Sequence, residues 1–146
     1  MSNMTDDIWN VNGFLDVNKQ KITEFSFLSL AVDELNIPVD VIKVIISLCA
    51  PEFTIIDNHI FIKSQFNRKK YEELTVSCSD LKEVQYWMNI ICISNISDRL
   101  LEVDTKQISE KIVNLWNLKI DSIGSNYKGR AHVIKDEDDG YFITIN

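Results

Sequence analysis

Glycine and proline are scarce in this sequence, and their scarcity limits both flexibility and chemistry. Four glycines, at positions 13, 124, 129 and 140, and two prolines occur among 146 residues, so long flexible linkers are not expected. The glycines lie too far apart to form a glycine-rich loop that cradles a phosphate. No serine has the flanking glycines that a nucleophile elbow requires. Phosphate-binding loops and hydrolases of that type are therefore not expected.

Histidine and cysteine are also rare. The two histidines are His59 and His132, and the three cysteines are Cys49, Cys78 and Cys92, with no CxxC, HxH or HExxH spacing among them. An odd number of unpaired thiols is typical of reduced, structural cysteines. We therefore expect no metal, no cofactor and no catalytic residues. Whether the two histidines meet in space cannot be read from their positions.

Long apolar runs are missing as well. The longest apolar region, residues 39–50, is interrupted by Asp40, Lys43 and Ser47, and it falls short of the roughly 20 residues that span a bilayer. The first seven residues are polar and acidic, whereas a secretory signal has a basic start and an apolar block. These features predict a cytoplasmic protein that does not bind membranes.

Charge is unbalanced in both amount and position. The chain has 22 acidic and 15 basic residues, a net charge of −7. Residues 1–62 hold nine acidic and three basic residues, a net −6, and residues 63–146 hold thirteen and twelve, a net −1. A negative field repels nucleic acids and attracts basic proteins. We interpret the basic patch formed by Lys63, Arg68, Lys69 and Lys70 as a solvated helix face and expect no nucleic-acid partner.

Apolar spacing predicts five helices, over residues 25–35, 39–50, 65–74, 80–93 and 104–123. The second of them is apolar except for one narrow stripe, which predicts a buried helix at the centre of the fold. Start signals that resemble capping boxes occur at Asp80 and Asp104. Trp87 and Trp116 fall on inward-facing stripes and are expected in the core.

Two hairpins complete the predicted fold. Alternating apolar residues surround Asp57-Asn58 in the range 53–63, and Asp139-Gly140 in the range 130–145. The fold class is therefore α+β, with a helical layer of about five helices and two antiparallel β-hairpins. The hairpins either join in one sheet of up to four strands or lie separately on the helices. The length predicts a single compact domain over residues 1–146, with residues 1–22 as an extended arm or short helix.

Charge without a catalytic set favours a non-catalytic protein-binding module. The partner-binding candidates are the acidic tip of the second hairpin, two carboxylates near the start of the last helix and an aromatic residue in the arm. They are Asp136, Glu137, Asp138, Asp139, Glu102, Asp104 and Trp9. The expected partner is a basic protein, and the composition is compatible with an immunity protein that inhibits a bacterial toxin.

Two alternative functions stay open from the sequence. The first is a structural or regulatory subunit that self-associates through the stripe at residues 112–116 or 84–87. The second is a small-molecule-binding domain or an enzyme, with its pocket between the helices and the sheet.

Overall fold

The computed structural model describes residues 10–18 and 23–146 of the chain. Its contacts divide the chain into two compact units, Met1–Val44 and Ile45–Asn146. The division falls at residue 44, farther along the chain than the arm boundary at residue 22 that the sequence suggests. The residues of α3, Val39–Cys49, fall on both sides of this division.

The N-terminal unit contains α1, Val11–Asn18, α2, Glu24–Glu34, and the first half of α3. Helices α1 and α2 contact each other, and α2 begins after Thr23, whose backbone N–H donates to the Ser26 hydroxyl at 3.4 Å. None of the side chains described in this unit is buried. Helices this short gain most of their stability from packing an apolar face.

Helix α3 confirms the predicted helix but not its predicted position. It begins after Pro38 and ends before Pro51, as the sequence indicates. None of its residues is buried, and the side chains of Val44 and Ile46 are 67% and 61% exposed. The prediction of a central buried helix is therefore wrong. An apolar pattern shows that a helix has surface to bury, but not which part of the protein will cover it.

The first hairpin of the C-terminal unit is confirmed. Strands β1, Phe53–Ile56, and β2, His59–Ile62, pair antiparallel. Asp57 and Asn58 between them have φ values of 50° and 64°, the left-handed conformation that a two-residue type I′ turn needs. All four residues of β2 are buried, so this strand is the part of the hairpin that packs in the core.

The second hairpin is also confirmed, within a larger sheet. Strands β4, Ala131–Asp136, and β5, Gly140–Ile145, pair antiparallel, and the short strand β3, Ile91–Cys92, adds to the other edge of β5. The α+β class is thus confirmed, with the two hairpins in separate sheets. The sequence predicts that residues 91–92 belong to the end of a helix, and this prediction is wrong.

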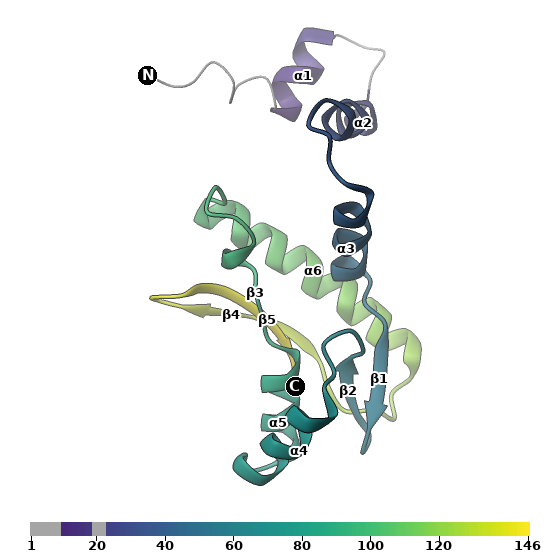
Figure 1. Cartoon of the computed structure of the whole chain (residues 1–146), viewed down its shortest axis with the longest axis vertical. Coiled ribbons are helices and arrows are strands. Elements are labelled where there is room, and N and C mark those ends of the chain that lie inside the picture. The colour runs from purple at the N-terminus through teal and green to yellow at the C-terminus, as the bar shows by residue number, and fades with distance from the viewer. Residues whose placement is uncertain (1–9, 19–22) are drawn as a thin grey trace. The chain divides into compact units, whose positions relative to one another are not determined.

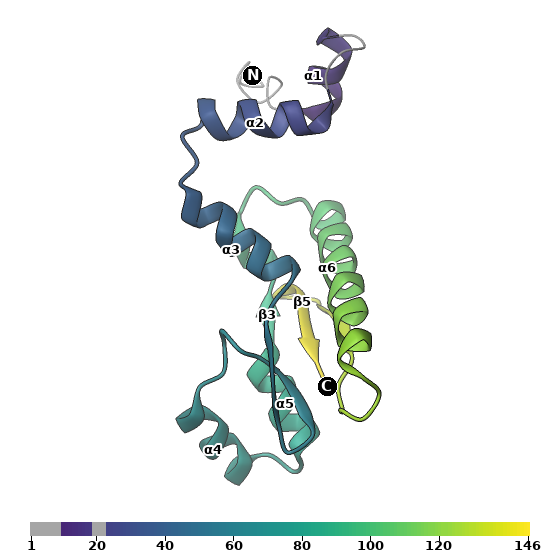
Figure 2. The same ribbon diagram turned by 90° about the vertical axis from the view of Figure 1, so that its right-hand side faces the viewer.

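Helices cover both sheets of the C-terminal unit. They are α4, Arg68–Ser77, α5, Leu81–Asn89, and α6, Glu102–Ile123, with a 3-10 turn, η1, at Ser94–Ile96. Helix α6 packs along β4 and β5, α5 packs on β2 and β5, and α4 packs beside α5 (Figures 1 and 2). Asp80 caps α5 as predicted, because its carboxylate accepts the Glu83 N–H at 2.8 Å. Helix α6 begins at Glu102, two residues before the predicted start.

Trp116 lies at the centre of the larger apolar cluster, as predicted, with no exposed surface. Its indole N–H donates to the Leu48 carbonyl at 2.7 Å. The prediction for Trp87 is wrong, because its side chain is 46% exposed. Helix α5 instead turns Val84, Gln85, Met88 and Asn89 inward, so its buried face contains two amides that an apolar pattern does not reveal.

Those two amides join the sheets. The buried Asn89 accepts the Ile62 N–H at 2.8 Å and donates to the carbonyls of Ile60 at 3.0 Å and Ile145 at 3.3 Å. Gln85 donates to the carbonyls of Ile60 at 2.9 Å and Lys128 at 2.7 Å. Asn89 therefore binds the edge of β2 to the end of β5. These amides satisfy backbone groups where two separate sheets meet.

Candidate functional site

Acidic residues from two distant segments meet at one cavity. The tip of the β4–β5 hairpin lies beside the start of α6, and a cavity of about 390 Å³ opens between them. Its lining includes Glu102, Lys135, Asp136, Glu137 and Asp138. We call this cavity the acidic cleft.

The other partner-binding candidates are placed differently. Asp139 belongs to the same hairpin tip, and Asp104 lies in the first turn of α6, but neither lines the acidic cleft. Trp9 lies outside the described residues, so the structure says nothing of it.

Two carboxylates of the acidic cleft are already engaged. Glu102 accepts a hydrogen bond from the Lys135 ammonium group, and this bond lowers the pKa of Glu102 and raises that of Lys135. Lys135 also lies 5.6 Å from the centre of the Tyr141 ring. Asp136 accepts the backbone N–H groups of Asp138 and Asp139, each at 2.9 Å, and so holds the hairpin turn.

Four carboxylates remain available around this position. Within the part of the chain that the structure describes, the carboxylates of Asp104, Glu137, Asp138 and Asp139 form no hydrogen bond or ion pair. Residues 94–106 and 135–139 together hold seven acidic and three basic residues, a net charge of −4. A negative field therefore surrounds the cleft, and its unpaired carboxylates can receive basic groups.

The turn held by Asp136 leads to a prediction about acid. The two backbone N–H donors lower the pKa of Asp136, so its stabilising effect is complete above the unfolded carboxyl pKa of about 3.9 and is lost as the pH falls through the lower folded value. We expect Asp136→Ala to be less stable than the wild type at neutral pH, with the difference disappearing near pH ~2. Urea unfolding at both pH values measures this.

Glu137→Ala is the matched control, because it removes a neighbouring carboxylate that holds no turn hydrogen bond. It should change stability little at either pH. A difference between Asp136→Ala and the wild type that stayed constant with pH would contradict the role given to the carboxylate.

Exposed apolar side chains adjoin the acidic cleft. Leu101, which is 66% exposed, and the exposed Val103 flank Glu102 in sequence, and the exposed Ile96 closes the turn that begins at Ser94 in the cleft wall. Apolar side chains with a charged rim are typical of protein interfaces. We call the acidic cleft together with these three residues the acidic-apolar surface. Sequence reasoning missed the apolar part because residues 94–103 have no helical or strand period.

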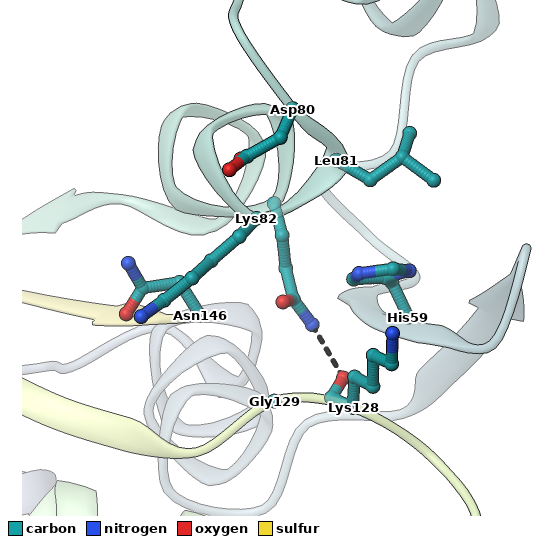
Figure 3. Close-up of a pocket in the computed structure, with 8 residues that line it drawn as sticks. His59, Asp80, Leu81, Lys82, Lys128, Gly129 and Asn146 are labelled. Carbon is teal, nitrogen blue, oxygen red and sulfur yellow. Dashed lines mark hydrogen bonds between the residues drawn. The ribbon is translucent and has the colours of Figure 1, made fainter.

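A second cavity, of about 490 Å³, surrounds His59 (Figure 3). The His59 Nδ1 atom lies 2.8 Å from the Asp57 carbonyl, and a carbonyl only accepts, so Nδ1 donates in this contact. Asp80 supplies the one acidic side chain of the lining, and it caps α5. Figure 3 shows the Asp80 carboxylate and the His59 ring apart from each other. This lining contains no serine, threonine or cysteine nucleophile.

The remaining chemistry-bearing residues stay dispersed. His132 lies in β4, in a different sheet from His59, and does not line the His59 cavity. Across residues 10–18 and 23–146, no group of three histidine, cysteine or acidic residues could hold a metal ion. In the same ranges, no helix has the length and apolar character needed to cross a bilayer.

The basic patch is an exposed surface whose charges have partners. Lys63 pairs with Glu52 at 2.8 Å, and Arg68 pairs with Glu72 at 3.0 Å. Lys69 lies 3.9 Å from Glu73, and Lys70 donates to the Trp87 carbonyl at 3.2 Å. These side chains are exposed, and that they face only solvent stays a prediction. The contacts with Glu52, Glu72 and Glu73 also reduce the attraction of this patch for nucleic-acid phosphates.

No protein-family model, no curated protein and no solved structure matches this chain.

Proposed function

We propose that this chain is a non-catalytic protein-binding module that covers a basic surface of a partner protein. The observation that supports the proposal is the acidic-apolar surface, which combines unpaired carboxylates at the cleft with exposed large apolar side chains next to it in the chain. The lining of the His59 cavity has no serine, threonine or cysteine. In the acidic cleft the Ser94 hydroxyl accepts the Tyr141 N–H, and the Thr105 hydroxyl donates to the Leu101 carbonyl. Binding is the activity that such a surface can perform unaided.

The two kinds of residue contribute differently to binding. Leu101 and Val103 supply apolar area that a partner can remove from water, and this gives most of the affinity. Glu137 and Asp138 supply an attractive field that raises the association rate and disfavours acidic partners. Because these contributions are separable, apolar variants should act mainly on dissociation, and charge variants should act mainly on association and its salt dependence.

The mechanism is occlusion. A partner whose active or binding surface is rich in lysine and arginine would lose access to its own anionic substrate when this module covers it. A cytoplasmic immunity protein that inhibits a basic bacterial toxin, such as a nuclease, is the class that fits best. A toxin gene beside the gene for this chain would support the assignment to that class.

A charge-reversed variant tests the proposal. We expect the full chain to retain a basic protein from a lysate of its native host at low salt and to release it at raised salt. The double variant Glu137→Lys/Asp138→Lys should reduce the retained amount about 10-fold or more, because it replaces attraction with repulsion. Quantitative pull-down at two salt concentrations measures both effects.

The matched control is Asp33→Lys/Glu34→Lys, which changes the net charge equally at exposed positions of α2. It should retain nearly the wild-type amount of partner. Equal losses in the two double variants would show a nonspecific effect of net charge. No retained protein at low salt would contradict the proposal as a whole.

A further inference from the structure

We infer that the His59 cavity binds a phosphate group that keeps a hydroxyl, either free phosphate or a small phosphate monoester. This inference goes beyond the proposed function, because it concerns a different surface and a different class of ligand. All the residues that line this cavity belong to the C-terminal unit.

The His59 cavity is basic, in contrast to the chain as a whole. Lys82 and Lys128 are the cationic residues of its lining, and Asp80 is the acidic one, so these side chains carry a net charge of +1 with His59 neutral. Among the described residues, the ammonium groups of Lys82 and Lys128 form no hydrogen bond or ion pair. The Asp80 carboxylate, in contrast, caps α5. Unpaired ammonium groups around a cavity attract anions.

Two nearly buried polar side chains of the lining each have an atom without a partner. His59 is 7% exposed and Gln85 is 1% exposed. Their other polar atoms are engaged with backbone carbonyls, but His59 Nε2 and Gln85 Oε1 form no hydrogen bond within the described residues. In the same residues, no fully buried side-chain nitrogen or oxygen lacks a partner. Both atoms therefore reach accessible surface, and the cavity that the two side chains line provides it.

This set of groups matches phosphate better than other common anions. The ammonium groups only donate, and Gln85 Oε1 only accepts, so a fitting ligand needs both charged oxygens and a hydroxyl. A singly protonated phosphate has both, and because the second pKa of a phosphate monoester is about 6, this form is accessible near neutral pH. Carboxylate and sulfate lack the hydroxyl. His59 Nε2 suits phosphate in either protonation state, since it accepts from P–OH when neutral and donates to a charged oxygen when protonated.

The backbone around Lys128 is held in place before any ligand binds. The Lys128 N–H donates to the Asn58 carbonyl at 2.7 Å. The Lys128 carbonyl accepts the Ile60 N–H at 3.1 Å and the Gln85 amide at 2.7 Å. Gly129 has a φ of 136°, and a Cβ at this position would lie 2.4 Å from the Gln85 amide nitrogen, so a larger residue would displace that amide. A wall fixed in advance lowers the entropy cost of binding.

Figure 3 shows how the two lysines are arranged in this cavity. The Lys128 side chain extends toward the His59 ring, whereas the Lys82 side chain extends toward Asn146. A phosphate group between Lys128 and His59 can contact both, and Lys82 adds to the positive field from another side. The cavity, of about 490 Å³, lies in the size range of small-molecule sites, so there is room for an organic group attached to the phosphate.

Titration of the full chain with inorganic phosphate, glycerol phosphate and sulfate tests the inference. At constant pH and ionic strength, phosphate should shift the NMR signals of the His59 ring to saturation, whereas those of His132, in β4, should stay in place. Sulfate should bind about 10-fold more weakly or worse, because it cannot donate to Gln85 Oε1. Tighter binding of glycerol phosphate than of inorganic phosphate would assign the site to an ester, and the reverse order would assign it to free phosphate.

Lys128→Met should weaken phosphate binding about 10-fold, because it removes the ammonium group that extends toward His59 and keeps the length of the side chain. Lys128 is exposed, so the circular dichroism spectrum should stay unchanged. Lys111→Met is the matched control, since it removes an exposed cation of α6 outside the cavity, and it should bind like the wild type. The inference would be overturned by a His59 signal that phosphate does not shift, by equal affinities for phosphate and sulfate, or by equal losses in the two lysine variants.

Discussion

Replacing Trp116 with alanine is expected to lower the free energy of unfolding of the C-terminal unit by roughly 3–5 kcal/mol. The side chain is fully buried at the centre of the larger apolar cluster, and its indole N–H bonds to the Leu48 carbonyl. Alanine would leave a cavity and an unsatisfied carbonyl together. Because small domains are stable by only about 5–15 kcal/mol, this loss is a large part of the whole.

Trp87→Ala provides the matched control, since it removes the same side chain from a half-exposed position. We expect a cost below about 1 kcal/mol. Trp116→Phe should fall between the two, because it keeps most of the volume and loses the hydrogen bond. Urea unfolding followed by circular dichroism measures all three. Similar losses for Trp87→Ala and Trp116→Ala would contradict the position given to Trp116.

Asn89→Ala should cost roughly 2–3 kcal/mol, although the removed side chain is small and polar. Its amide is fully buried and satisfies the N–H of Ile62 and carbonyls of Ile60 and Ile145. Without it the Ile62 N–H is left buried with no acceptor, and this loss is more costly than the loss of an exposed hydrogen bond. Urea unfolding again gives the value.

Asn114→Ala is the control for this experiment, because Asn114 is exposed on α6. It should leave stability unchanged or raise it slightly, since alanine favours the helix more than asparagine. If Asn89→Ala unfolded at the same urea concentration as the wild type, the amide would not hold the two sheets together.

Turn, proline and capping residues in the sequence correctly predicted the first hairpin and the ends of two helices, because these features depend on contacts between residues close together in the chain. Asp57 and Asn58 tolerate positive φ, and the first hairpin turns at these residues. Pro38 and Pro51 limit a helix by removing backbone donors and restricting their neighbours, and α3 lies between them. The start of α5 at Asp80 follows in the same way from a side chain that reaches its own backbone.

Features that depend on distant partners were not predictable. Helical spacing predicts that Trp87 is buried. In the structure Gln85 and Asn89 lie on the buried face of α5 instead, where their amides form hydrogen bonds with backbone groups of β2. Strand β3 exists because β5 offers a free edge, and its two residues carry no strand pattern of their own. The exposure of α3 also depends on distant parts of the chain, so its own apolar pattern does not predict it.

The candidate site was predictable in its residue types but not in its arrangement. Composition identified Glu102 and the hairpin tip as acidic candidates, and the structure brings Glu102 together with Asp136, Glu137 and Asp138. The pairing of Glu102 with Lys135 depends on a contact between residues 33 positions apart. That these residues contact a partner stays a prediction.

The amide of Asn89 also restricts what evolution can place at that position. One end of the amide must accept a hydrogen bond and the other must donate hydrogen bonds, at a position that is fully buried. Aspartate lacks the donor, and leucine, which has nearly the same shape, lacks both functions. Substitution at position 89 is therefore limited by hydrogen-bond polarity, whereas the surrounding isoleucine positions are limited mainly by volume.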